Sequence, residues 1–297
     1  MPNITANGIE IYVETHGEPE ATPLVLVRGL GTQIVHWPSA MLQHLIAAGF
    51  FVITADNRDA GLSQKFDDWG TIDEAELTRC IEQNLPITTA YPARAFADDH
   101  FGVMDHFGIE RAHLLGMSMG GMIVQTMAAA KPDRVISMTS VMSSSGNPDI
   151  PMGKPHARAL LLAEPQDPTD RQSVIDFTLQ CDRVWGSPGY PFLDSERAEL
   201  IGRAYDRCWT PEGVKRQYAA VRAQGSRIPL LKKISAPSLV LHGLDDSLLQ
   251  PEHGRDTAHH IDRATFTEIP GMGHDLEGQL SVIVASHFVT HARAAEA

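Results

Sequence analysis

A serine stands between two glycines in the stretch GMSMG, residues 116–120. A short apolar run, 112–115, precedes it, and a helix-like segment follows it. In a loop this pattern would be only a turn. Between a buried strand and a helix, it holds the serine hydroxyl at the apex of a strained elbow, where glycine avoids clashes with neighbouring backbone. The context therefore predicts that Ser118 is a nucleophile.

A serine nucleophile needs a base, and the base needs an acid that orients it. After an elbow serine these follow in the chain order acid, then histidine. The stretch GLDD (243–246) ends a buried run, and the stretch GMGH (271–274) places a histidine after the last strand-like run. We therefore expect His274 to be the base and Asp246 to be the acid.

Other residues compete for these two positions. Asp245 precedes Asp246 directly, and because successive residues leaving a strand point to opposite sides, only one of them can reach the base. We expect Asp245 to face solvent or to cap a helix. Asp149, which follows the apolar run 135–141, is a further candidate for the acid. His242 is expected to pack at its strand end rather than to bind a ligand.

Attack on a carbonyl carbon also requires two hydrogen-bond donors for the oxyanion. One is expected to be the N–H of Met119, directly after the nucleophile. The second should come from the loop RGLG (28–31), where the N–H of Leu30 is favoured and Gly29 keeps the backbone close. The alternative for this loop is an ordinary strand-to-helix turn.

The elements that would position these residues follow a regular alternation. Continuous apolar runs bounded by proline or glycine are typical of strands buried on both faces. They occur at 23–29, 50–56, 112–116, 135–141 and 237–243, with alternating or weaker runs at 9–13 and 264–271. Helical patterns lie between and after them, at 38–49, 93–109, 120–132 and 279–295. This order predicts an α/β fold with a mostly parallel sheet flanked by helices.

The alternation breaks between residues 142 and 237, where helix-like segments alternate with proline- and glycine-rich stretches. We expect a mainly helical cap over 142–237, inserted into a core formed by 1–141 and 238–297. A smaller insertion is expected over 65–92. Excursions of this length commonly form lids or binding segments.

Apolar side chains in the cap and beside the serine suggest a substrate pocket. Gly29, Met117 and Trp185 are the expected pocket residues. The residues considered for an apolar acyl or alcohol pocket are Trp185, Tyr190, Phe192, Trp209, Met117 and Met119. The alternative is that the cap aromatics only hold the cap together.

Composition limits the class of protein. The chain has 297 residues, of which 43% are hydrophobic and 21% are charged, with a formal net charge of −13. An acidic surface repels polyphosphate, so neither nucleic acid nor an anionic membrane is an expected partner. The three cysteines lack a CxxC or zinc-like pairing and suit a reducing compartment. The N-terminus lacks a signal-peptide pattern and no apolar run has transmembrane length, so we expect a soluble, cytoplasmic protein.

Several motifs together resemble the α/β-hydrolases of the serine esterase type, in particular aclacinomycin methylesterase-like hydrolases. GMSMGG, GLDD and GMGH match the nucleophile, acid and base motifs of that superfamily. VRGLG resembles its His-Gly loop, with Arg28 in place of histidine. DNRDAGLS (56–63) resembles a structural turn, with Asp59 in place of its first glycine. We expect Asp59 to alter local backbone freedom more than chemistry.

The resemblance and the residues together predict hydrolysis of small to medium apolar carboxylic esters through an acyl-enzyme. Such a reaction needs no metal and no organic cofactor, and its partner is a small-molecule ester. Perhydrolase or haloperoxidase, lactonase and C–C hydrolase activities use the same triad and stay open. A non-catalytic small-molecule receptor is a further alternative, disfavoured because binding alone needs no acid to orient a base. Oligomeric state is left open, with a dimer as one option.

Overall fold

The computed structural model describes residues 2–297, and across these residues eight strands form one sheet in the order β1-β2-β4-β3-β5-β6-β7-β8. β1 and β2 pair antiparallel to each other, and β2 pairs antiparallel to β4. The remaining pairs are parallel. The strands are β1 (Asn3–Ala6), β2 (Ile9–His16), β3 (Thr22–Val27), β4 (Phe50–Ala55), β5 (Ala112–Met117), β6 (Val135–Val141), β7 (Ser238–Gly243) and β8 (Thr265–Ile269).

Burial along the strands explains why the sequence pattern predicted them. β4, β5 and β7 are buried at every position, because helices cover both faces of the sheet. β8, at the edge, is only partly buried, in line with its weaker apolar run. β1 was not predicted, since its short sequence NITA carries little apolar signal; it is held by the hairpin with β2.

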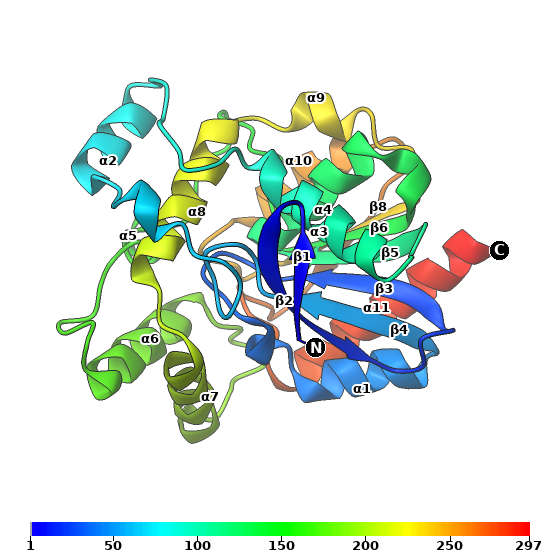
Figure 1. The fold of residues 1–297 in the computed structure, drawn as a ribbon, viewed down its shortest axis with the longest axis horizontal. Helices are drawn as coiled ribbons and strands as arrows, with labels where there is room; N and C mark the ends of the chain where they lie inside the picture. The colour runs from blue at the N-terminus through cyan, green and yellow to red at the C-terminus, as the bar shows by residue number, and fades with distance from the viewer. Residues whose placement is uncertain (1) are drawn as a thin grey trace.

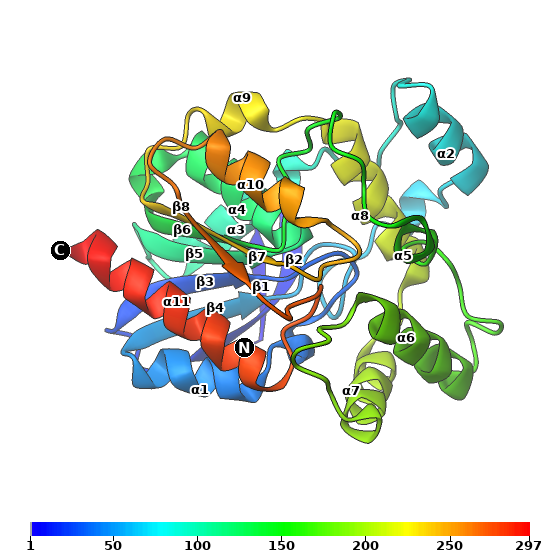
Figure 2. The ribbon, with the colours of Figure 1, turned by 180° about the vertical axis from the view of Figure 1, so that it is seen from behind.

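Helices cover the two faces of this sheet (Figures 1 and 2). α1 (Ser39–Ala47) and α11 (Gly278–Glu296) pack together on one face and enclose one apolar core. α3 (Arg94–His106) and α4 (Met119–Ala130) pack together on the other face, and α10 (Pro251–His259) covers β7 and β8. A mostly parallel sheet between helical layers confirms the predicted fold class.

The chain between β6 and β7 contains α5 (Pro155–Ala159), α6 (Arg171–Trp185), α7 (Asp194–Arg207), α8 (Pro211–Gln224) and α9 (Ile228–Leu231). α5 to α8 lie to one side of the sheet (Figure 1). α2 (Glu74–Glu82) lies beside α8, where Lys215 Nζ pairs with Glu74 Oε1 at 2.6 Å. α9 instead packs against α4. Short 3₁₀ helices are η1 (Ile34–His36), η2 (Asp67–Trp69) and η3 (Pro132–Arg134).

Asp59, in the loop after β4, links this loop to α8. The expectation that Asp59 mainly alters backbone freedom is therefore incomplete. Its φ is 64°, a left-handed conformation that favours glycine, yet its carboxylate is fully buried. The carboxylate accepts hydrogen bonds from Arg216 Nη2 at 2.8 Å, Tyr91 Oη at 2.6 Å and the Phe66 N–H at 2.9 Å. Arg216 belongs to α8 and also pairs with Asp67 at 2.7 Å. The buried Asp59 carboxylate therefore connects α8 with the segments that contain Phe66 and Tyr91.

Replacing Arg216 with methionine is expected to lower the free energy of unfolding by about 3–5 kcal/mol, because it leaves the Asp59 carboxylate buried without its cation. Urea unfolding followed by circular dichroism measures this difference. Arg171→Met is the control, because Arg171 pairs with Asp206 in the same segment but both side chains are about half exposed. We expect it to cost less than about 1 kcal/mol. Equal effects of the two variants would contradict an anchoring role for Asp59.

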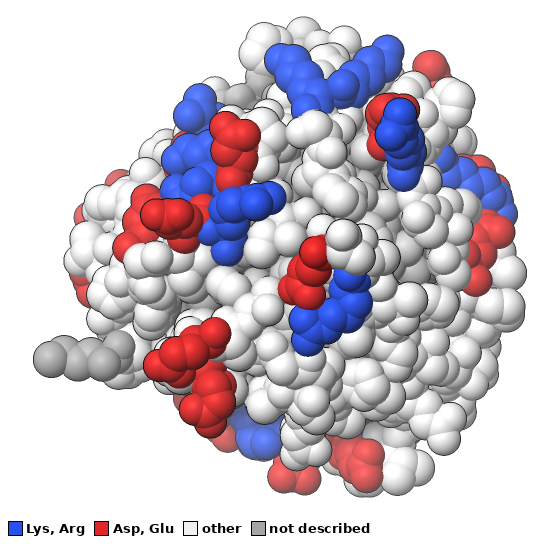
Figure 3. All heavy atoms as spheres, turned by 90° about the vertical axis from the view of Figure 1, so that its right-hand side faces the viewer, with Lys and Arg blue, Asp and Glu red and all other residues white. Residues whose placement is uncertain are grey.

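Surface charge and helix length bear on nucleic acid and membranes as partners, which the sequence disfavours. Figure 3 shows the face opposite α5 to α8, where basic and acidic side chains are interspersed and separated by uncharged surface. Among the helices of residues 2–297, none combines the length and the apolar character that a membrane span requires. In the same residues no group of three or more His, Cys, Asp or Glu side chains is arranged to hold a metal ion.

Candidate active site

Ser118 sits in a strained turn between β5 and α4. Its φ of 53° and ψ of −121° place a non-glycine residue in a sparsely populated region. The flanking glycines make this possible. A Cβ atom on Gly116 would lie 2.1 Å from the Gly120 carbonyl oxygen, and one on Gly120 would lie 2.1 Å from that of Val27. The turn thus presents the hydroxyl above the carboxyl end of the sheet.

His274 connects this hydroxyl to a carboxylate. His274 Nε2 lies 2.9 Å from Ser118 Oγ, and His274 Nδ1 lies 2.7 Å from Asp246 Oδ2. The other carboxylate oxygen, Asp246 Oδ1, accepts the N–H groups of Leu248 at 2.9 Å and Leu249 at 2.8 Å. The structure therefore brings the three predicted residues into one hydrogen-bonded chain. The two backbone N–H groups fix the orientation of the Asp246 carboxylate.

The electrostatics of Asp246 favour its ionised form. Burial by itself would raise the pKa of this carboxyl group, since the side chain is fully buried. Attraction to the charged form of His274, the hydrogen bond from His274 and the nearby ring of His242 outweigh burial and hold the pKa of Asp246 well below its usual range. The carboxylate is thus negative at neutral pH and can stabilise a positive charge on His274.

The competing residues lie elsewhere. Asp245 is exposed, and its Oδ2 accepts the N–H of Gly271 at 2.9 Å, which fixes the turn before His274. Asp149 is exposed in the loop after β6. His242 is fully buried at the end of β7, where Nε2 lies 2.7 Å from the Leu249 carbonyl oxygen and 3.5 Å from Asp246 Oδ2.

The loop that carries His274 is held by residues at the end of α6. The His274 N–H donates to the Trp185 carbonyl at 2.7 Å, and the Gly273 N–H donates to Ser187 Oγ at 2.8 Å. The contact is close enough that a Cβ atom on Gly273 would lie 2.2 Å from the Gly186 carbonyl oxygen. The segment between β6 and β7 therefore helps to position the histidine.

Two backbone N–H groups beside Ser118 are available as donors. Met119 is the first residue of α4, whose N-terminal end carries positive partial charge, and Leu30 lies in the loop after β3. Within residues 2–297, neither of these two N–H groups donates a hydrogen bond. Gly29 keeps the loop close, since its Cβ would lie 3.2 Å from Ser118 Cβ. Both groups could receive an oxyanion.

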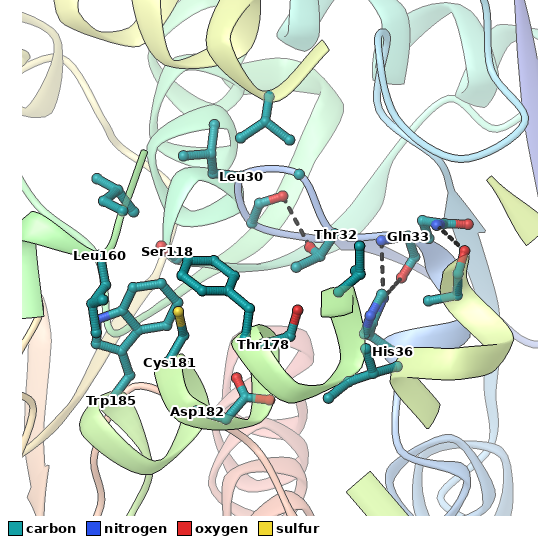
Figure 4. A pocket seen from close by; sticks show the side chains of 18 of the residues that line it. Leu30, Thr32, Gln33, His36, Ser118, Leu160, Thr178, Cys181, Asp182 and Trp185 are labelled. Carbon is teal, nitrogen blue, oxygen red and sulfur yellow. Dashed lines mark hydrogen bonds between the residues drawn. The ribbon is translucent and has the colours of Figure 1, made fainter. Parts of the chain in front are cut away.

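Two cavities meet at Ser118. The first has a volume of about 300 Å³ and lies between the loop after β3 and helices α6 and α7 (Figure 4). The second has a volume of about 660 Å³ and lies between α8, the loop after β6 and residues 80–87. Both cavities are lined by Leu30, Ser118, Leu161 and Leu248. A molecule bound at Ser118 can therefore extend in two directions.

The expected pocket residues divide between the cavities and the packed interior. Gly29, Met117, Trp185 and Trp209 line the first cavity, and Met119 lines the second. Figure 4 shows Trp185 beside Leu160 and Cys181. Tyr190 instead packs against the core of the sheet, and Phe192 packs against α6 and α7. Trp185 and Trp209 thus fit the pocket interpretation, whereas Tyr190 and Phe192 fit the packing alternative.

The sequence did not identify several polar residues of the first cavity. They are Arg28, Gln33, His36, Asp182 and Arg197. Arg28 alone gave a signal, as a departure from the superfamily motif. Burial, and then the positive charges of Arg28 and Arg197, lower the pKa of His36 to about 3, so this imidazole is neutral near pH 7.

A serine elbow whose hydroxyl is linked through histidine to aspartate, at the carboxyl edge of a mostly parallel sheet, defines the α/β-hydrolase class. The chain belongs to the α/β hydrolase fold family, whose sequence profile matches residues 22–276. This match confirms the family expected from the motifs.

The chain is also similar to named relatives over most of its length. It is 26% identical to the rhodomycin D methylesterase DauP of Streptomyces sp. (strain C5), with 98% of each chain covered. It is 23% identical to 3-oxoadipate enol-lactonase 2 of Acinetobacter baylyi, over 89% of this chain and 86% of the relative. The crystal structure of an enol-lactonase from Burkholderia xenovorans LB400 has the same fold, with a TM-score of 0.75, 21% identity and coverage of 98% and 100%.

Proposed function

We propose that this protein is a serine hydrolase that cleaves carboxylic esters through an acyl-enzyme. The observation that carries the proposal is the chain of hydrogen bonds from Ser118 Oγ through His274 to Asp246, where two cavities meet. The similarity to a methylesterase over nearly the whole chain supports an ester as the substrate.

Acylation begins when Ser118 Oγ attacks the ester carbonyl carbon and transfers its proton to His274 Nε2. The oxyanion of the tetrahedral intermediate accepts hydrogen bonds from the N–H groups of Leu30 and Met119. Asp246 orients His274 and stabilises its imidazolium. The intermediate then collapses, the carbon–oxygen bond to the alcohol breaks, and His274 gives its proton to the departing alcohol.

Deacylation repeats these steps with water. His274 takes a proton from water as the water oxygen attacks the acyl carbon bound to Ser118. The same two N–H groups hold the second oxyanion. Collapse releases the carboxylic acid, and the proton on His274 returns to Ser118 Oγ. The products are one acid and one alcohol, and the residues described here perform each proton transfer.

Residues 142–237 are proposed to act as the cap, over a core of residues 1–141 and 238–297. The cap contributes α6, α7 and the start of α8 to the first cavity, and the later part of α8 to the second. An ester has an acyl part and an alcohol part, and the two cavities at Ser118 match these two parts. This arrangement favours an open-chain ester over a small lactone, although a lactonase would use the same three residues.

A panel of substrates tests the proposal. Short-chain p-nitrophenyl esters, methyl and ethyl esters, and lactones are compared by their kcat/KM values with the purified protein. We expect turnover of the open-chain esters, with values above those of small lactones. Turnover of lactones alone, or of none of the compounds, would contradict the proposed reaction.

Trp185→Ala is expected to change the ratio of kcat/KM between a bulky ester and an acetyl ester by about 10- to 100-fold, because one lost apolar pocket contact changes discrimination by about 1–3 kcal/mol. The Trp185 side chain lines the first cavity, with its Nε1 donating to the Ala157 carbonyl at 2.9 Å.

Phe192→Ala is the matched control, because Phe192 packs within the cap. We expect it to lower the Tm and to leave the ratio within about threefold of wild type. If Trp185→Ala instead reduces kcat/KM equally for both esters and lowers the Tm, then Trp185 serves only to hold the cap together.

A further inference from the structure

Arg28 lies directly after β3, two residues before Leu30, and its side chain is held in one place. It is 7% exposed. Its Nε donates to Thr32 Oγ1 at 3.4 Å, and its guanidinium lies over the Trp37 ring, 4.8 Å from the ring centre. Contacts on the ring face and at Nε leave the outer edge of the guanidinium, with its two terminal nitrogens, free to meet another molecule.

Within residues 2–297, no carboxylate oxygen lies within 4.0 Å of the Arg28 guanidinium, and neither terminal nitrogen donates a hydrogen bond. These nitrogens are not sealed inside the protein, since Arg28 lines the first cavity together with Ser118. Burial, and then the charge of Arg197, lower the pKa of Arg28 to about 9, with Glu277 opposing, so Arg28 remains positive at neutral pH. A buried cation without a contacting anion is costly to a folded protein.

The nearby carboxylates already have partners. Arg197 Nε binds Asp182 at 2.6 Å, and Arg197 Nη1 binds Glu277 at 2.5 Å. Asp275, which also lines the first cavity, accepts hydrogen bonds from the N–H and the hydroxyl of Ser187. Glu277 influences Arg28 through its charge but makes its contact with Arg197. No carboxylate of residues 2–297 therefore contacts the guanidinium of Arg28, a residue that lines the first cavity.

We propose that Arg28 binds a carboxylate carried by the substrate, so that the enzyme acts on esters that bear a free carboxylate near the scissile bond. This inference rests on the proposed ester hydrolysis. Two parallel N–H donors of a guanidinium match the two oxygens of a carboxylate. The carboxylate end occupies the first cavity beside Ser118, and the uncharged part occupies the larger second cavity. Monoesters of dicarboxylic acids carry such a free carboxylate, and so do hydroxy acids that are esterified at their hydroxyl group.

The test compares matched esters in wild type, Arg28→Met and Arg28→Lys. The mono-aryl ester of glutaric acid carries a free carboxylate on the acyl side, and the mixed aryl methyl diester of glutaric acid is its neutral partner. Acetylglycolate carries the carboxylate on the alcohol side, and methyl acetylglycolate is its neutral partner. We expect wild type to prefer one of the charged esters over its neutral partner. Arg28→Met should lower kcat/KM for that charged ester by about 100-fold and for the neutral ester by less than about threefold.

Arg28→Lys should recover only part of the lost activity, because an ammonium lacks the paired donors. A second readout does not depend on catalysis: free glutarate should raise the Tm of wild type and slow labelling of Ser118 by a fluorophosphonate, and should do neither in Arg28→Met.

Equal loss for charged and neutral esters in Arg28→Met, or preference of wild type for the neutral esters, would overturn the assignment. So would equal stabilisation of wild type and Arg28→Met by glutarate. Absence of hydrolysis of every ester would overturn the proposed function alone, because the Tm measurement tests carboxylate binding at Arg28 without any reaction.

Discussion

Ser118→Ala is expected to lower kcat for a p-nitrophenyl ester by about 10⁴-fold or more. The substitution removes only the hydroxyl group, whose oxygen Oγ is the atom that would form the covalent bond. The residual rate would come from binding and from the oxyanion donors. The elbow should persist, because its geometry depends on the glycines at 116 and 120 and on the hydrogen bond from the Ser118 N–H to the Val141 carbonyl at 2.9 Å.

Ser238→Ala provides the control for this variant. Ser238 is a buried serine at the start of β7, and its hydroxyl donates to the Ala236 carbonyl at 2.9 Å. We expect its kcat to remain within about threefold of wild type. Circular dichroism and the Tm verify that both variants are folded. If kcat of a folded Ser118→Ala variant stays within about tenfold of wild type, Ser118 is not the nucleophile.

Asp246→Asn is expected to lower kcat by about 10²- to 10⁴-fold, by analogy with other triads. The amide keeps the shape of the side chain but removes the negative charge that stabilises the imidazolium. It also changes the hydrogen bond to His274 Nδ1, 2.7 Å away, which selects the tautomer. Measuring kcat on one ester at one pH gives the size of the effect.

Asp245→Asn is the matched control, since it alters the adjacent residue in the same chemical way. Asp245 is exposed, and the asparagine oxygen can still accept the Gly271 N–H. We expect kcat to change by less than about tenfold, because a charge in solvent acts only through a screened field. Loss of activity in Asp245→Asn with a normal rate in Asp246→Asn would reverse the assignment of the acid.

The core of the fold was predictable because its strands bury both faces. The apolar run 135–141 coincides with β6, and the runs at 50–56 and 237–243 contain β4 and β7. The helices α2, α6 and α7 were harder to predict, since each of them buries only a few side chains along one face. Asp73 and Asp170 accept the N–H groups of Glu76 and Ser173 and so cap α2 and α6.

The local motifs of the candidate site were visible because each is a short run of residues beside a strand end. The contacts between distant segments were not. The support of His274 by Trp185, the burial of Asp59 against Arg216 and the second cavity all join residues far apart in the chain. Arg28 stood out in its motif, but its uncompensated charge became apparent only from the surrounding side chains.

The central claim is that Ser118 becomes covalently bonded during the reaction, and peptide mass spectrometry after treatment with a fluorophosphonate tests it most directly. The account predicts one adduct, on the peptide that contains Ser118, with loss of esterase activity in proportion to labelling. It also predicts slower labelling in Asp246→Asn and none in Ser118→Ala. Full esterase activity in a protein whose Ser118 remains unlabelled, or an inactivating adduct on another residue, would contradict it.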